Sequence, residues 1–128
     1  MKVLKIIVFA LLTSCQGEVI NVCSFYASFG AQGHRYSEFR GSVGIAVDDN
    51  RIYVTDRGNN RIQVFNKNAF TFISKFGENG RKEGSFNHPV GIWIDDSKIY
   101  ISDHENHRIQ TPNYKSNLIP CAKGNSSE

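Results

Sequence analysis

The sequence has no segment that keeps the 3.6-residue apolar periodicity of a helix over a useful length. Its longest apolar run, Ile6 to Leu12, is far shorter than the roughly 20 residues that a membrane-spanning helix requires. The glycine-rich stretch Phe76–Gly84 (FGENGRKEG) lacks the Lys-Ser/Thr pair of a phosphate-binding loop and opens no helix. Turn geometry explains its glycines. These absences argue against a helical bundle, a membrane-spanning protein and a P-loop nucleotide site.

The N-terminal segment has the features of a secretory signal peptide. Lys2 and Lys5 flank a basic start, an apolar run follows, and small residues come next, so we expect residues 1–17 to be removed. A competing interpretation uses Leu12–Cys15, which resembles a bacterial lipoprotein box and would place a lipid on Cys15. A third is an unprocessed N-terminus from a mis-started gene. We predict a secreted or extracellular protein, with a lipid anchor at Cys15 as the alternative.

Removal of that segment leaves a chain with little net charge and two cysteines. The 15 Lys and Arg residues fall to 13, against 12 Asp and Glu, so the pI of about 8.8 does not indicate nucleic-acid binding. Cys23 and Cys121 lie near the two ends of the mature chain. They either form a disulfide in an oxidising compartment or remain two free thiols.

An internal repeat organises residues 25–110. Residues 43–65 (VGIAVDDNRIYVTDRGNNRIQVF) return as residues 90–110 (VGIWIDDSKIYISDHENHRIQ) at a constant offset of 47 residues, with no insertion or deletion. A fixed period of about 20–50 residues indicates a solenoid or a propeller.

The pattern within one repeat favours the propeller. Each repeat contains short apolar runs rich in Val, Ile, Phe and Tyr, separated by turn residues. The runs are Val43–Val47, Ile52–Thr55, Ile62–Phe65, Phe70–Phe76, then Val90–Ile94, Ile99–Ser102 and one that begins at Arg108. Pro112 ends the last run because proline cannot donate a ladder hydrogen bond. We predict an all-β fold of antiparallel four-stranded blades, about two blades of an incomplete β-propeller, with an irregular tail over residues 111–128.

One further run lies ahead of the first blade. Phe25–Phe29 (FYASF) precedes Phe72–Phe76 (FISKF) by one period, so we expect it to be a fourth strand separated from its own blade. A ring needs about four to eight blades, and two blades leave apolar faces that invite association. Either the chain is part of a longer protein, or several copies complete one ring, three copies giving six blades.

The repeat resembles the NHL repeat family, whose units carry a Phe-Gly pair, spaced glycines and a D-x-x-N-x-R-I-Q stretch. The second copy matches from Phe76 to Gln110, and the first from Phe29 to Phe65 with Ser42 at the position of the usual Pro. The resemblance implies repeats at about residues 29–65 and 76–110. It also implies a non-catalytic module that binds a protein or another ligand.

An enzyme is the first alternative. The stretch Asp56–Gln63 is similar to one in peptidyl-hydroxyglycine lyases, in which an Arg serves an active site with zinc held by histidines. One of those histidines follows a Pro, and the matching positions here are Val43 and Val90. We therefore expect no zinc site, no other cofactor and no catalysis.

The second alternative is the NHL part of a tripartite-motif ubiquitin ligase, which would bind RNA or protein. The chain has no Cys/His cluster of RING type, and the basic residues His34, Arg35, Arg81 and Lys82 do not alternate with aromatic residues. We therefore expect a protein or peptide partner rather than nucleic acid, and membrane contact only through a lipid on Cys15.

Two copies of D-x-x-N-x-R supply the candidate site residues. They are Asp56, Asn59, Arg61, Asp103, Asn106 and Arg108. An Asx side chain at this turn can accept backbone N–H bonds, and Arg61 can pair with Asp56. Recurrence in both repeats favours a structural role, whereas the binding hypothesis lets one Arg face the central channel and bind an anion.

Three other features are interpreted as structural. His104 and His107 could reach one metal ion, but we expect them in a solvated turn. The pairs Asp48-Asp49 and Asp95-Asp96 are interpreted as hairpin caps rather than calcium ligands. Trp93, where the first repeat has Ala46, is expected to fill the core between blades.

Overall fold

The computed structural model describes residues 24–95 and 98–113. The expected signal peptide, Cys15, Cys23, Cys121 and the tail beyond residue 113 lie outside the described residues. The described part is built of β-strands and two 3₁₀ turns. They are β1 (Ala31–Gln32), β2 (Glu38–Phe39), β3 (Ser42–Val47), β4 (Arg51–Asp56), η1 (Arg57–Asn59), β5 (Arg61–Asn66), β6 (Phe72–Phe76), β7 (Pro89–Ile94), β8 (Ile99–Asp103), η2 (His104–Asn106) and β9 (Arg108–Gln110). No helix of this part is long and apolar enough to cross a membrane.

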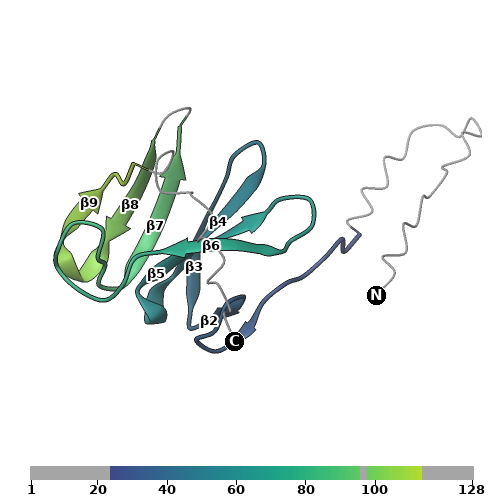
Figure 1. The fold of residues 1–128 in the computed structure, drawn as a ribbon, viewed down its shortest axis with the longest axis horizontal. Helices are drawn as coiled ribbons and strands as arrows, with labels where there is room; N and C mark the ends of the chain where they lie inside the picture. The colour runs from purple at the N-terminus through teal and green to yellow at the C-terminus, as the bar shows by residue number, and fades with distance from the viewer. Residues whose placement is uncertain (1–23, 96–97, 114–128) are drawn as a thin grey trace, which may run out of the picture.

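Strands β3 to β9 form two blades side by side, as Figure 1 shows, and β1 pairs with β2 in a separate two-stranded parallel sheet. Blade 1 is the antiparallel sheet β3-β4-β5-β6, and blade 2 is the antiparallel sheet β7-β8-β9. Each blade is a consecutive up-and-down meander. The predicted all-β fold with blades of an incomplete propeller is therefore confirmed.

The turns between strands follow from local chemistry. The Asp48 carboxylate accepts the backbone N–H groups of Asn50 and Arg51, at 2.9 and 2.7 Å, and so caps the β3–β4 hairpin. Asp95 accepts the N–H of Lys98 at 2.7 Å in blade 2. The interpretation of these aspartates as hairpin caps is confirmed. The strand expected from Phe70 begins only at β6, because Phe70 has a positive φ of 56° and belongs to the preceding turn.

Each blade has two faces, because successive side chains of a strand point to opposite sides. We call the side of blade 1 that carries Tyr53, Ile62 and Val64 face A, and the side that carries Val54 and Phe65 face B. In blade 2 the residues 47 positions later take the same face names, so Tyr100 and Ile109 lie on face A and Ile101 lies on face B.

The main core lies between the two blades. Face A of blade 1 packs against Ile99 and Ile101 on face B of blade 2, and the side chain of Phe86 completes the cluster. Tyr53, Ile62, Val64, Phe86, Ile99 and Ile101 are all fully buried. Burying each such side chain contributes about 1.5–3 kcal/mol, so this cluster is what holds blade to blade.

A second cluster covers part of face B of blade 1. Here Phe65 is fully buried, with the ring of Phe29 at 5.0 Å and that of Phe39 at 5.8 Å between centroids. Phe29 and Phe39 stand one period before Phe76 and Phe86. The segment ahead of blade 1 therefore covers this face with Phe29 and Phe39. The segment between β6 and β7 covers the equivalent face of blade 2 with Phe86.

The expectation of a strand at Phe25–Phe29 is wrong. Residues 24–30 have no regular structure, and Figure 1 shows this segment running away from the sheets. A strand needs a neighbour to pair with, and β6, its equivalent, pairs with β5. No described strand lies beside Phe25–Phe29, and the segment contacts blade 1 through the rings of Tyr26 and Phe29.

The expectation that Trp93 fills the core is also wrong. Its side chain is 63 % exposed and contacts the ring of Tyr100, with centroids 5.7 Å apart. Trp93 pairs across the sheet with Tyr100, which places it on face A of blade 2. That face is covered by no element of the described residues.

Candidate functional site

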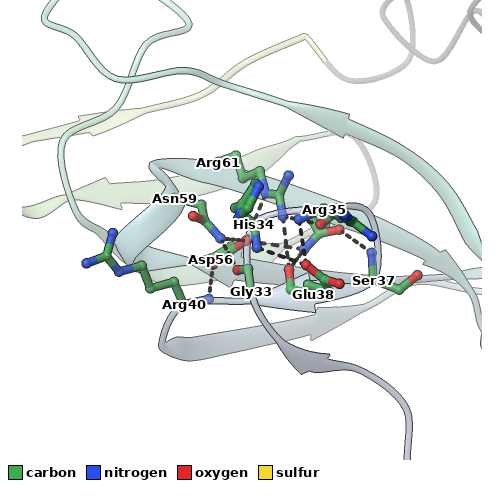
Figure 2. Close-up of polar contacts among 10 residues, drawn as sticks. Gly33, His34, Arg35, Ser37, Glu38, Arg40, Asp56, Asn59 and Arg61 are labelled. Carbon is green, nitrogen blue, oxygen red and sulfur yellow. Dashed lines mark hydrogen bonds and ion pairs between the residues drawn. The ribbon is translucent and has the colours of Figure 1, made fainter.

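The candidate residues gather at one end of each blade, where a 3₁₀ turn meets the segment that enters the blade. We call these entering segments crossovers: residues 30–41 for blade 1 and residues 77–88 for blade 2. In blade 1 the turn η1 joins β4 to β5 and lies against residues 33–41. The N–H of Gly58 donates to the carbonyl of Arg40 at 2.8 Å, and that of Arg57 to the carbonyl of Gly41 at 3.1 Å. Figure 2 shows the polar side chains beneath this contact.

The Asp56 carboxylate is the centre of the cluster and is fully buried. One oxygen accepts the backbone N–H of Arg40 at 2.8 Å. The other accepts the side-chain donors of Asn59 at 2.8 Å, Arg61 at 2.8 Å and Gln63 at 3.2 Å. The predicted pair between Arg61 and Asp56 is confirmed, and the buried charge is balanced by it.

The partners of Asp56 bind the crossover as well. Arg61 donates to the carbonyls of Arg35 and Glu38, at 2.6 and 2.9 Å. Asn59 donates to the carbonyl of Gly33 at 2.9 Å. The dashed lines in Figure 2 mark these bonds. We call Asp56, Asn59, Arg61 and Gln63 the clamp of blade 1, because they fasten the incoming crossover to the blade.

Gln63 completes this clamp and was not among the expected residues. Its amide donates to the carbonyl of Glu38 at 2.7 Å and its oxygen accepts the N–H of Ser37 at 3.0 Å. The signal was present in the sequence, because Gln110 stands one period later.

Blade 2 repeats the arrangement as a second clamp of Asp103, Asn106, Arg108 and Gln110. Asp103 accepts Arg108 at 2.8 Å and Asn106 at 2.9 Å. Arg108 also donates to the carbonyls of Arg81, Lys82 and Ser85, between 2.7 and 3.0 Å. The side chain of Arg108 is 30 % exposed against 7 % for Arg61, so the second clamp is the more open of the two.

The protonation state of the Asp103 carboxyl is set by its burial and its hydrogen bonds. Burial raises the pKa of the carboxyl, but the hydrogen bonds from Asn87, Asn106, Arg108 and Gln110 outweigh it and lower the pKa below the ordinary value of 3.8. The carboxylate is therefore charged at neutral pH, and its acceptor capacity is taken up by the clamp.

The exposed groups around the clamps are mostly cationic. Arg35, Arg40, Arg57, Arg81 and Lys82 have exposed side chains at this end of the two blades, and we call them the basic rim. Within residues 24–95 and 98–113 none of the five forms an ion pair. Glu38, the carboxylate nearest in sequence to Arg35 and Arg40, instead accepts the backbone N–H groups of His34 and Arg35.

Hydrogen bonds hold together the loops that carry the basic rim. The N–H of His88 donates to the side chain of Asn60, at 2.8 Å, and so links the crossover of blade 2 to the turn of blade 1. The N–H of Glu105 donates to the carbonyl of Asn87, at 3.1 Å. The basic rim is thus mounted on loops that are held at several points.

The histidines and acidic pairs lie apart from one another. His104 and His107 are exposed in and after η2, as expected, and His104 contacts Glu105 at 3.1 Å. In the described ranges, no three His, Cys, Asp or Glu side chains come close enough to share a metal ion.

Two stacked antiparallel meanders, each with a polar clamp at its turn end, define a β-propeller type of repeat protein. Residues 39–65, from β2 to β5, match the family model of the NHL repeat. Residues 39–65 are therefore an NHL repeat. No curated protein sequence matches the chain.

Proposed function

We propose that this NHL-repeat chain is a non-catalytic binding module that holds an acidic protein or peptide on its basic rim. The observation that carries the proposal is the division of labour among its cations. Arg61 and Arg108 are paired with the aspartates of the clamps. The rim cations are exposed and have no ion-pair partner in the described part.

The clamps explain why these loops suit binding. Loops that carry binding residues work best on a rigid scaffold, because less ordering is needed when the partner arrives. Arg35 and Arg81 each offer a carbonyl to a clamp arginine, at 2.6 and 2.7 Å, so their backbone is fastened while their side chains face solvent. The guanidinium groups can then pair with carboxylates in a forked geometry.

A catalytic use of Arg61 is disfavoured by its contacts. The guanidinium donates to Asp56 and to two crossover carbonyls, and the residue is only 6 % exposed. A ligand would have to displace bonds to a buried carboxylate, and leaving that carboxylate unpaired costs about 3–5 kcal/mol. Direct anion binding through Arg61 or Arg108 stays a prediction. The exposed cations of the basic rim are better placed to bind an anion.

The test measures binding of a fluorescein-labelled oligoglutamate peptide to the full chain by anisotropy, with an oligolysine peptide and polyuridine RNA as comparisons. The double variant Arg40→Glu, Arg57→Glu is expected to weaken oligoglutamate binding about tenfold, because each exposed ion pair is worth about 0.2–1 kcal/mol and reversal adds repulsion. Binding is also expected to weaken with added salt.

Lys75→Glu is the matched control, since Lys75 is an exposed cation on the outer strand β6 of the same blade. It is expected to leave oligoglutamate binding unchanged. Equal loss in the control, or binding of polyuridine without binding of oligoglutamate, would contradict the proposal of an acidic protein partner.

A further inference from the structure

Two faces of the described chain expose apolar side chains at opposite ends of the two-blade stack: face A of blade 2, and the β3 part of face B of blade 1, which the second cluster leaves open. Face A of blade 2 exposes Trp93 at 63 % and Ile109 at 64 %. Face B of blade 1 exposes Ile45 at 63 %, Val43 at 54 % and Val47 at 48 %. Exposed apolar groups gathered on a sheet face mark an interaction surface.

We propose that copies of this chain associate head to tail, with face A of blade 2 of one copy packed on face B of blade 1 of the next. The contact between the blades within one chain is the template. There, face A of blade 1 meets face B of blade 2 through fully buried side chains such as Tyr53 and Ile101. The 47-residue repeat places Tyr100 on face A of blade 2 where Tyr53 stands in blade 1, and the exposed Ile45 on face B of blade 1 where Ile92 stands in blade 2. Each copy therefore carries both halves of a similar contact.

The polar part of the template is also repeated. Within the chain, the hydroxyl of Thr55 donates to the carbonyl of Val90 in the neighbouring blade at 2.9 Å. The equivalent hydroxyl, Ser102, accepts the N–H of Gly91 at 2.6 Å but donates to no carbonyl within the described residues. In the head-to-tail contact its acceptor is the carbonyl of Val43 in the next copy, which stands one period before Val90.

A pair of glycines points the same way. A Cβ at Gly44 would lie 2.4 Å from the carbonyl oxygen of Val90, so the close approach of the two blades requires glycine there. A Cβ at the equivalent Gly91 would meet only Ser102 of its own blade, among the described residues. Gly91 thus keeps free the space that a neighbouring backbone occupies at Gly44.

The faces differ in size at one position, and the structure has room for the difference. Trp93 replaces the small Ala46 of the template. Face B of blade 1 carries an open hollow of about 290 Å³, lined by Phe29, Phe39, Val43, Ile45 and Val54 among others. The indole of Trp93 is the largest exposed apolar group available to fill a hollow of this kind.

Head-to-tail contacts are heterologous, and they close into a ring when the rotation per copy permits. Because a propeller ring contains about four to eight blades, two to four copies of this pair of blades complete one. A second copy is the occupant that the observations favour, since it supplies the apolar, polar and glycine features together.

The first measurement is the mass of the full chain by light scattering from about 1 to about 100 µM, since association is governed by mass action. Masses above that of a single 14.4 kDa copy are expected. Trp93 is the only tryptophan, so its emission reports the contact directly. The emission is expected to shift to shorter wavelength as the concentration rises and Trp93 leaves water.

The second measurement uses one variant for each face. Trp93→Asp spoils face A of blade 2, and Ile45→Asp spoils face B of blade 1, so each variant alone is expected to be monomeric. Mixed together, they are expected to form a 1:1 dimer, because each keeps the face that the other lost. Ile109→Asp is a second face A variant, and it keeps the test valid if Trp93→Asp does not fold.

The matched control is Ala69→Asp, which adds the same carboxylate at an exposed turn between β5 and β6. It is expected to associate like the unchanged chain. A monomeric unchanged chain over the whole range, with emission independent of concentration, would overturn the proposal. So would association that survives both face variants, or a mixture of the two variants that remains monomeric.

Discussion

The hydroxyl of Thr55 donates to the carbonyl of Val90, 2.9 Å away, and this single bond joins β4 of blade 1 to β7 of blade 2. The same hydroxyl accepts the N–H of Gly44 at 2.6 Å. Thr55 is fully buried, so its hydroxyl is bonded to these backbone groups in place of water. The hydroxyl of Thr55 thus bonds the backbone of both β3 and β7 and fixes the distance between them.

Replacing Thr55 by Val therefore keeps the shape but removes the bonds. We expect Thr55→Val to lower the free energy of unfolding by about 1–3 kcal/mol, because the partly buried N–H of Gly44 and carbonyl of Val90 lose their partner. Urea unfolding at neutral pH measures the loss. Thr55→Ser retains the hydroxyl and should lose clearly less; equal losses in the two variants would show that the methyl group, not the hydroxyl, matters.

The clamp of blade 1 gives a larger expected effect. Asp56→Asn leaves the guanidinium of Arg61, only 6 % exposed, without its carboxylate. Breaking a buried ion pair from one side costs about 3–5 kcal/mol, so we expect a loss of that size in the free energy of unfolding. The control is Asp49→Asn, an exposed carboxylate that should change stability by no more than about 0.5 kcal/mol. Indistinguishable unfolding curves for the two variants would contradict the role of the clamp.

The second clamp makes stability depend on acid. Because the pKa of Asp103 is lower in the folded chain than its ordinary value of 3.8, the unfolded chain takes up the proton first as the pH falls. The contribution of Asp103 is fully present above that value and is lost as the pH falls toward the folded pKa.

We therefore expect Asp103→Asn to be less stable than the unchanged chain at neutral pH and to lose less stability on acidification below about pH 4. Urea unfolding at several pH values between neutrality and strong acid gives both slopes. Glu83→Gln, at an exposed position in the crossover, should keep the slope of the unchanged chain. A slope that Asp103→Asn leaves unaltered would rule out this carboxylate as the cause.

The crossover between the blades offers a paired test of backbone and packing. Gly77 and Gly84 have positive φ angles of 89° and 77°. An ideal Cβ at Gly77 would lie 2.4 Å from the ring of Phe86 in the core, whereas one at Gly84 meets nothing within 4 Å.

Gly84→Ala is therefore expected to cost about 1–2 kcal/mol in unfolding free energy from the backbone alone. Gly77→Ala should cost more, because the Phe86 ring must also move out of a closely packed cluster. Thermal unfolding compares the two. A smaller loss for Gly77→Ala than for Gly84→Ala would mean that the crossover relaxes away from Phe86 at little cost.

Much of this fold could be predicted from local sequence. The runs Val43–Val47 and Ile52–Thr55 became β3 and β4, since β-branched residues between turn residues favour strands. The pairing of Asp56 with Arg61 was also predictable, because the two flank one tight turn. The partners that the clamp takes from the crossover were not, because they lie about 25 residues away along the chain.

The sequence alone determined the repeat of 47 residues. It also determined the strands, their turns and the recurring Asp–Arg pairs, because each of these depends on neighbours only a few residues apart. The tertiary structure decided which faces are covered. Phe25–Phe29 has the composition of a strand and Trp93 that of a core residue, yet neither finds a neighbouring sheet in the described chain. Burial and strand pairing are properties of a pair of surfaces, so a residue's own pattern cannot specify them without the partner that packs against it.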